Sequence, residues 1–370
     1  MIETKKFYDY LLKNELDLFA GVPDSLLKNL CAYINDNCDK DKNIITANEG
    51  NAIAIAAGYH LSTSKYGVVY MQNSGVGNAI NPLLSLADED VYSIPMLLIV
   101  GWRGEPGTKD EPQHIKQGKV TLPLFQTMDI ETLILEENYE QQIDYCIEYM
   151  KNRNKPIALI VQKDSFTDYK TVIQTNNYSI SREEALDTII RNLDEHDFMV
   201  TTTGKTSREV YELREIYQQG HSNDFLTVGS MGHTASIAFG MSIATEKAIY
   251  CIDGDGSFLM HTGGFAFIAQ NAKNNLKYIL INNGAHESVG GQPTVALDID
   301  IPMILRGFGF KNVYEASNLD EINDGVTALK ANKKLSALII YTKQGSRKDL
   351  GRPKTTPIEN KIAFMDNIQK

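Results

Sequence analysis

The chain has 370 residues, 42% of them hydrophobic, and a formal net charge of −11. This length suits two domains of ordinary size, each with enough apolar side chains for its own core. The acidic balance argues against nucleic acid or an anionic membrane as a partner, so an anionic ligand would need a local cluster of Arg, Lys or His.

The cysteines and the N-terminal segment indicate a reducing compartment. Cys31, Cys38, Cys146 and Cys251 show no spacing typical of a metal or redox motif. Residues 1–16 read as an amphipathic helix rather than a signal peptide, and no apolar run approaches the length of a membrane span. We therefore expect a cytoplasmic protein.

Short apolar runs bounded by turn residues recur through the first half and predict buried strands. They cover residues 18–20, 43–47, 68–71, 94–100 and 157–161. Helical segments lie between several of them, which is the pattern of a parallel α/β sheet. We expect this domain to cover residues 1–165 and a polar, aperiodic linker to cover residues 166–180.

Two carboxylates follow strands in this half. Asp24 comes after the strand at 18–20, and a helix is expected to begin at Asp24 or Ser25, so its carboxylate is either a helix N-cap or a functional group at a strand end. Glu49 lies in the first turn of an alanine-rich helix, where it could simply complement the helix dipole. The residues alone leave both alternatives open.

A glycine-rich polar loop is expected at residues 72–82, before another helix. It could bind a phosphate or let the backbone, near Asn73, approach an aromatic ring closely. A second, longer polar loop is expected at residues 101–114. Long loops are often functional, and this one carries Arg103, Lys109 and His114; a solvated surface loop is the alternative.

The second half repeats the pattern of strands separated by helices. A helix is expected from Ser181, and the domain is expected to cover residues 181–370. The predicted strands are residues 198–202, 225–228, 248–252, 278–281 and 337–341. The fold class is therefore α/β, with two doubly wound parallel-sheet domains.

Two segments of this half leave a strand and precede a helix. Residues 203–208, with sequence TGKTSR, offer Gly204 and Thr206 as candidates for binding an anion at a helix start. They do not form a P-loop, because the upstream glycine and its spacing are missing. Residues 229–233, with sequence GSMGH, place Met231 before a small-residue helix, where core filling is the alternative.

The sequence Gly254-Asp255-Gly256 lies between a strand and a helix, and Asn283 follows the next strand. Asp255 and Asn283 should then lie at the carboxyl ends of neighbouring strands, where open α/β sheets bind ligands. Carboxylate and amide oxygens suit Mg²⁺, and the amides of Gly256 and Ser257 suit a phosphate. A tight turn and a surface asparagine pair are the alternative.

This GDG sequence, followed after a spacer by Asn282-Asn283, resembles the signature of thiamine diphosphate (ThDP) enzymes. The resemblance implies a pyrimidine-binding and a diphosphate-binding domain of one common fold. It also implies that Asp255, Asn283 and the carbonyl of Ala285 hold Mg²⁺. Assignment of Asn283 rather than Asn282 comes from the family pattern.

The same resemblance implies further roles around the cofactor. Glu49 would activate it, and the segment with Asn73 would meet the aminopyrimidine. The carbonyl of Gly229 would accept a hydrogen bond from the 4′-amino group, and Met231 would be the apolar wedge between the two rings. Gly254 would permit close approach of the diphosphate. A homodimer, with active sites between subunits, is the smallest competent unit that the resemblance implies.

Other motifs resemble the phosphonopyruvate decarboxylase branch of this family. They are GVPDSLL at 21–27, NEGNAIA at 48–54, QNSGVGN at 72–78, DEPQH at 110–114, HESVGGQPT at 286–294 and DLGRP at 349–353. The implied reaction is decarboxylation of a small anionic 2-keto acid, 3-phosphonopyruvate, in phosphonate biosynthesis. The alternatives are a decarboxylase of sulfopyruvate or another short 2-keto acid, a catalytically silent ThDP-binding paralogue, and an unrelated nucleotide-binding α/β protein.

For that reaction, Asp24 and His114 are the candidates for proton transfer, and Asp110 is a weaker third. Four cationic side chains remain open as contacts of the phosphonate: Arg103, Lys109, Arg347 and Arg352.

Overall fold

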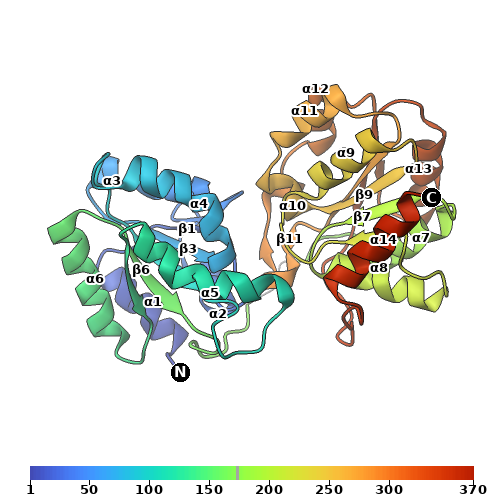
Figure 1. Ribbon diagram of the computed structural model, residues 1–370. Coiled ribbons are helices and arrows are strands. Elements are labelled where there is room, and N and C mark those ends of the chain that lie inside the picture. The colour runs from blue at the N-terminus through green and yellow to red at the C-terminus, as the bar shows by residue number, and fades with distance from the viewer. Residues whose placement is uncertain (172–174) are drawn as a thin grey trace. The chain divides into compact units, whose positions relative to one another are not determined.

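The computed structural model describes residues 1–171 and 175–370, and the chain divides into two compact units (Figure 1). Unit 1 contains Met1–Ile173 and Ser288–Gln292, and unit 2 contains Gln174–Glu287 and Pro293–Lys370. Each unit is built on a six-stranded sheet in which every pair of neighbours is parallel. The predicted α/β class with two parallel-sheet domains is confirmed.

The sheet of unit 1 has the order β2-β1-β3-β4-β6-β5. Its strands are β1 (Phe19–Gly21), β2 (Asn43–Ile45), β3 (Val68–Gln72), β4 (Leu97–Gly101), β5 (Glu131–Ile134) and β6 (Ile157–Val161). Its helices are α1 (Thr4–Lys13), α2 (Lys28–Asn37), α3 (Glu49–Thr63), α4 (Val76–Pro82), α5 (Pro112–Thr127) and α6 (Tyr139–Arg153). Parallel strands need such crossover connections, because no tight hairpin can join them.

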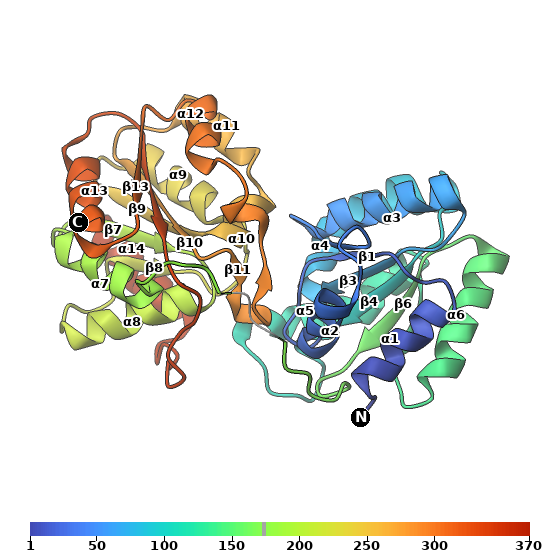
Figure 2. The ribbon, with the colours of Figure 1, turned by 180° about the vertical axis from the view of Figure 1, so that it is seen from behind.

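Helices cover both faces of this sheet (Figure 1, Figure 2). One core packs beneath α1, α2 and α6 and the other beneath α3, α4 and α5. Alternate residues of β3 feed the two cores: Tyr70 enters the first, while Val69 and Met71 enter the second. Burial on both faces explains the continuous apolar runs that revealed these strands in the sequence.

The sheet of unit 2 has the order β13-β14-β10-β9-β7-β8. Its strands are β7 (Phe198–Thr201), β8 (Asp224–Leu226), β9 (Ile249–Gly254), β10 (Leu276–Asn282), β13 (Asn312–Ala316) and β14 (Ser336–Tyr341). One face carries α7 (Arg182–Asn192), α8 (Lys205–Ile216) and α13 (Leu319–Ala331). The other carries α9 (Thr234–Ala244), α10 (Asp255–Met260), α11 (Gly264–Asn271), α12 (Ile301–Phe308) and α14 (Pro357–Ile368). The short strands β11 (Ala285–His286) and β12 (Gln292–Pro293) follow β10.

Some local expectations were wrong. The helix after Asp24 begins at Lys28 rather than at Asp24 or Ser25. The expected loop at residues 72–82 is helical, with a 3₁₀ turn at Asn73–Gly75 leading directly into α4. Glycine and asparagine are poor helix formers, but tertiary packing of Val76 and Ala79 overrides that propensity.

The GDG sequence, which was placed between a strand and a helix, is divided between the two. β9 runs through Gly254 and α10 begins at Asp255. The edge strands β5 and β13 were not predicted, because their residues are only partly buried and form no apolar run. In the described parts of the chain, 1–171 and 175–370, no helix has both the length and the apolarity that crossing a bilayer requires.

Candidate active site

In unit 2 the structure brings Asp255 and Asn283 together. β10 lies parallel to β9 with Ile281 opposite Gly254, where β9 ends. Asp255 is the next residue after Gly254, and Asn283 directly follows the last residue of β10, Asn282. Neighbouring strands are about 4.8 Å apart, and their carboxyl ends share one edge of the sheet. Two oxygen-bearing side chains from residues far apart in sequence therefore meet at this edge.

The Asp255 carboxylate is buried, and the donors that contact it are neutral. One oxygen accepts a hydrogen bond from the Thr294 hydroxyl at 2.8 Å, and the other accepts one from the Gly256 amide at 2.9 Å. Burial raises the pKa of Asp255 to about 6, although Thr294 and backbone amides, including that of Ala285, act to lower it. A cation beside this carboxylate would offset the cost of its burial.

The Asn283 side chain is held by two hydrogen bonds. Its Oδ1 accepts one from the Ala285 amide at 3.0 Å, and its Nδ2 donates one to Glu287 at 2.9 Å. Within residues 1–171 and 175–370 no three His, Cys, Asp or Glu side chains cluster as metal ligands. A divalent cation here would rely on the Asp255 carboxylate with amide and carbonyl oxygens, a donor set that fits Mg²⁺ completed by water or phosphate.

The start of α10 is closely packed. A Cβ placed on Gly256 would lie 3.0 Å from the His286 ring and 3.0 Å from Cε of Met231. The Ser257 hydroxyl accepts a hydrogen bond from the Gly232 amide at 3.1 Å. The GSMGH segment and the GDG segment, both predicted to contact the cofactor, therefore lie against each other. Burial lowers the pKa of His286 to about 4, so this imidazole is neutral at physiological pH.

The start of α8 places the TGKTSR segment at the carboxyl end of β7. Gly204 precedes the helix with φ of 91°, a conformation that favours glycine. The Ser207 hydroxyl donates to the Thr202 carbonyl at 2.7 Å and fixes this turn. Thr206 is buried in the first turn of α8. Gly229 lies in the corresponding position after β8.

Glu49 is the first residue of α3, after the N-cap Asn48. It is 4% exposed, and its Oε2 accepts a hydrogen bond from Nδ2 of Asn78 at 2.8 Å. A Cβ placed on Gly75 would lie 2.1 Å from its Oε1, so the carboxylate occupies the space of an absent side chain. Burial raises the pKa of Glu49, while the Asn78 amide acts to lower it. This environment favours a carboxyl group that holds or shares a proton.

Asp24 is held in a similar way at the carboxyl end of β1. It is fully buried, and its Oδ2 accepts a hydrogen bond from the Leu26 amide at 2.9 Å. A Cβ placed on Gly101 would lie 2.1 Å from this same oxygen. Burial raises the pKa of Asp24 to about 6, and the positive charge of Arg103 acts to lower it. Oδ1 is buried without a hydrogen-bond partner in the described structure.

Arg103 and Asp110 form an ion pair beside Asp24. Nε of Arg103 donates to Asp110 at 2.8 Å, and Nη1 donates to the Ser25 hydroxyl at 2.7 Å. Asp110 also accepts hydrogen bonds from the backbone amides of Gly104 and Glu111. These contacts hold the pKa of Asp110 well below its usual range, despite burial. Asp110 is therefore a permanently ionised partner of Arg103 and a poor proton donor.

His114 lies in the first turn of α5, not in the loop where it was expected. It is 8% exposed, and its Nδ1 is buried without a hydrogen-bond partner in the described structure. Burial, together with Arg103, lowers the pKa of His114 to about 4. The ring is thus a neutral imidazole near pH 7, able to accept a proton or donate its N–H.

The Asn73 side chain connects neighbouring segments of unit 1 through hydrogen bonds. Its Nδ2 donates hydrogen bonds to the Arg103 carbonyl and to the Thr121 hydroxyl, both at 2.8 Å. Its Oδ1 accepts a hydrogen bond from the Arg103 amide at 3.1 Å. The side chain ties β3 to the segment after β4. Any contact of this residue with a cofactor would come from its backbone.

Among the cations proposed for the phosphonate, Arg103 and Arg347 form ion pairs with carboxylates. Arg103 pairs with Asp110, and Arg347 pairs with Glu183 and Glu212. Lys109 is exposed, and Arg352 lines a cleft of unit 2 that Arg347 also lines.

Sequence analysis missed partners of the expected site residues. Asn78 contacts Glu49, Thr294 contacts Asp255 and Glu287 contacts Asn283. All three lie inside motifs that had been recognised without a role for these positions, QNSGVGN and HESVGGQPT. Polar residues inside a recognised motif were the available signal.

Comparison with known proteins gives two family matches. Residues 4–122 match the thiamine pyrophosphate enzyme, N-terminal TPP binding domain, and residues 202–340 match the C-terminal TPP binding domain. Thiamine pyrophosphate (TPP) and ThDP are the same compound.

Relatives that match almost the whole chain are decarboxylases. Phosphonopyruvate decarboxylase of Streptomyces hygroscopicus is 33% identical over 360 residues, 92% of this chain and 87% of the relative. The enzyme of the same name from Streptomyces viridochromogenes is 32% identical, over 92% and 88% respectively. Sulfopyruvate decarboxylase of Methanosarcina acetivorans is 27% identical over 367 residues, 92% of each chain.

Replacement of Asp24 by Asn should stabilise the chain in a pH-dependent way. The folded pKa of about 6 lies above the ordinary 3.8, so the protonated carboxyl contributes stability below pH 4 that is lost as the pH rises through 6. Because Asn imitates the protonated form and keeps an acceptor for Leu26, Asp24→Asn should gain about 2 kcal/mol at pH 8 and little at pH 4.

The measurement is the thermal unfolding midpoint of the cofactor-free protein at both pH values. Asp9→Asn, at an exposed position of α1, is the matched control and should shift the midpoint little at either pH. A gain of equal size at both pH values would contradict the raised pKa of Asp24.

Proposed function

This chain belongs to the family of thiamine pyrophosphate enzymes and is a 2-keto-acid decarboxylase, and we propose that its substrate is 3-phosphonopyruvate, converted to phosphonoacetaldehyde and CO₂. The observation that carries the proposal is that two phosphonopyruvate decarboxylases each match 92% of this chain. We place the reaction in phosphonate biosynthesis. Family membership excludes the unrelated nucleotide-binding protein considered from the sequence.

We propose that the diphosphate end of ThDP binds at unit 2 through Mg²⁺. Asp255, Asn283 and the carbonyl of Ala285 would hold the cation. The backbone at Gly254, Gly256 and Ser257, with Gly204 and Thr206 at α8, would face the phosphates. Support comes from the arrangement of these groups at the carboxyl ends of neighbouring strands, two of them at helix starts.

Bound ThDP supplies an electron sink for the electron pair released as CO₂ leaves. Glu49 would activate the cofactor. Its Oε2 accepts the hydrogen bond from Asn78, which leaves Oε1 to hold a proton toward the cofactor. Gly229 would contact the pyrimidine ring of the cofactor, and Met231 would lie between its two rings. Burial of the Glu49 carboxyl, which raises its pKa, supports this role.

We propose that Asp24 and His114, which both interact electrostatically with Arg103, transfer a proton to the product side. Asp24 can exist in both protonation states near neutrality, because its pKa is about 6. His114 has a pKa of about 4 and would take part as a neutral donor or acceptor. Arg103, Lys109, Arg347 and Arg352 remain candidate phosphonate contacts, and Arg103 is the one beside Asp24.

The proposed smallest competent unit is a homodimer, in which a pyrimidine-binding half of one chain works with the diphosphate-binding half of its partner. Glu49 and Asp255 belong to different units of the chain, which is compatible with that arrangement. Sedimentation at concentrations that support activity tests the proposal, and a fully active monomer would contradict it.

Glu49→Gln should lower decarboxylation about 100-fold or more with saturating ThDP and Mg²⁺, because the amide cannot take up or release the carboxyl proton. Aldehyde formation is the measurement. Glu140→Gln changes an exposed glutamate of α6 in the same way and should leave the rate near that of the wild type. Near-normal turnover by Glu49→Gln would remove this residue from its proposed role.

Substrate preference separates the proposed function from its alternative. The ratio kcat/KM for phosphonopyruvate should exceed the ratios for sulfopyruvate and pyruvate by about 10-fold or more, equivalent to about 1.4 kcal/mol. The physical reason is that a phosphonate carries more negative charge than a sulfonate and makes stronger hydrogen bonds to Arg or Lys. Measured initial rates with the three substrates decide this.

A higher ratio for sulfopyruvate would favour the sulfopyruvate decarboxylase alternative, which the relative from Methanosarcina acetivorans supports. Turnover of none of the three, by a protein that binds ThDP, would indicate the catalytically silent paralogue.

A further inference from the structure

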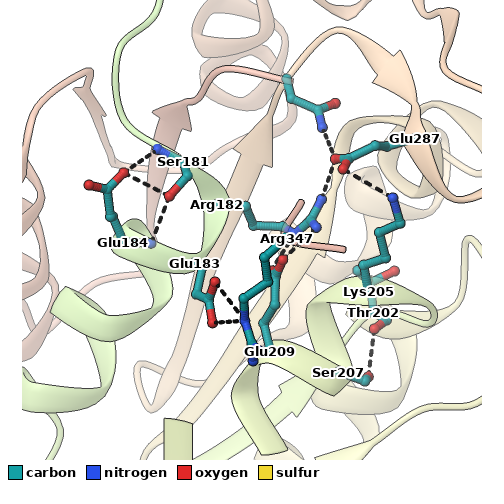
Figure 3. Close-up of polar contacts among 11 residues, drawn as sticks. Ser181, Arg182, Glu183, Glu184, Thr202, Lys205, Ser207, Glu209, Glu287 and Arg347 are labelled. Atoms are coloured by element: carbon teal, nitrogen blue, oxygen red, sulfur yellow. Dashed lines mark hydrogen bonds and ion pairs between the residues drawn. The ribbon is translucent and has the colours of Figure 1, made fainter. Parts of the chain in front are cut away.

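A buried ion network adjoins the Asn283 side chain in unit 2 (Figure 3). Arg182 donates from Nε and Nη2 to Glu209 at 2.6 and 2.8 Å, and from Nη1 to Glu287 at 2.6 Å. Glu209 is 1% exposed and Arg182 is 6% exposed. A charged pair at this depth requires close geometry to offset its loss of hydration, so the guanidinium position is tightly fixed.

The start of α7 fixes where Arg182 lies. Ser181 caps the helix and forms a capping box with Glu184, so Arg182 becomes the first helical residue (Figure 3). A cation at this end of a helix opposes the helix dipole. The contacts with Glu209 and Glu287 compensate for that position, and they direct the guanidinium toward the loop after β10.

Glu287 receives hydrogen bonds from three side chains. Its Oε2 accepts from Arg182 at 2.6 Å and from Nδ2 of Asn283 at 2.9 Å, and its Oε1 accepts from Lys205 at 3.3 Å. Arg182 and Lys205 thus form ion pairs with the two oxygens of this carboxylate. The network therefore presents a carboxylate to the Asn283 amide.

An ionised carboxylate can only accept hydrogen bonds. The Asn283 amide therefore turns its Nδ2 toward Glu287, and its Oδ1 faces the opposite way, where it also accepts the hydrogen bond of the Ala285 amide. Without the carboxylate, the Ala285 amide alone would favour this orientation over the rotated one, in which the amide oxygen and nitrogen exchange places. In the rotated state a nitrogen, which cannot bind a cation, would occupy the place of the oxygen.

We propose that Glu287 is a positioning residue for the metal ligand Asn283: it selects the amide orientation in which Oδ1 faces the cation, and Arg182 holds Glu287 in the place where it does so. This inference rests on the proposed function, because it takes Asn283 as a ligand of the cation. It assigns a task to Glu287, which contacts the Asn283 amide.

Glu287→Gln is the direct test, because Gln keeps the size of the side chain but offers both a donor and an acceptor. Loss of such an outer contact typically weakens metal affinity 10- to 100-fold. We therefore expect the Mn²⁺ concentration for half-saturation, at saturating ThDP, to rise about 10-fold or more. Electron paramagnetic resonance of free Mn²⁺ measures it on the full-length protein. The kcat at saturating Mn²⁺ should stay within about 3-fold of the wild type, since the oriented state is still accessible.

Glu183→Gln is the matched control. Glu183 lies one residue after Arg182 and pairs with Arg347, so the substitution removes a carboxylate from the same helix turn but leaves the contact with Asn283 intact. Its Mn²⁺ affinity should equal that of the wild type. Unchanged Mn²⁺ affinity in Glu287→Gln would overturn the inference alone, whereas a wild type that shows no ThDP-dependent Mn²⁺ binding would overturn the proposed metal site as well.

A paired substitution keeps the inference testable if Glu287→Gln does not fold. In Asn283→Asp two carboxylates face each other. Adding Glu287→Gln restores a donor opposite an acceptor with the two groups exchanged. The double variant should bind Mn²⁺ about 10-fold more tightly than Asn283→Asp alone and should unfold at a higher temperature. A double variant no better than Asn283→Asp in both measurements would contradict an orienting role for position 287.

Discussion

The parallel register of β9 and β10 is the constraint on which the candidate site depends. Because Ile281 lies opposite Gly254, Asp255 and Asn283, which follow the two strands, emerge at one edge of the sheet. The paired residues that fix this register are buried and mostly apolar. Asp255 therefore has to lie in a dry environment, which raises its pKa and creates the need for a positive counter-charge.

The parts of the fold that the sequence predicted are those where one residue pattern has one physical cause. Central strands buried on both faces are mostly apolar, and polar residues at their ends, such as Asp255 and Asn283, have few structural reasons to be there. α4 was missed because its helicity comes from packing of Val76 and Ala79, whereas its composition is typical of a loop. His114 was assigned to a loop because Pro112 begins its helix only two residues earlier.

The hydrogen-bond partners of the site residues could not be predicted from the sequence, because they depend on distances in the folded chain. Arg182 and Glu287 are separated by 105 positions and are joined by a hydrogen bond of 2.6 Å. Thr294 reaches Asp255 across 39 positions. Periodicity and local motifs carry no information about such pairs, since either residue of a pair looks like an ordinary surface group in isolation.

Two carboxylates of unit 1, Glu49 and Asp24, lie where the side chains of Gly75 and Gly101 would otherwise be. The positions of these two carboxylates therefore depend on Gly75 and Gly101, which have no side chain. One added methyl group at either would displace a carboxylate while every titratable residue stayed in the sequence. A substitution at either glycine would therefore disturb the site although every acid, base and proposed metal ligand were still present in the sequence.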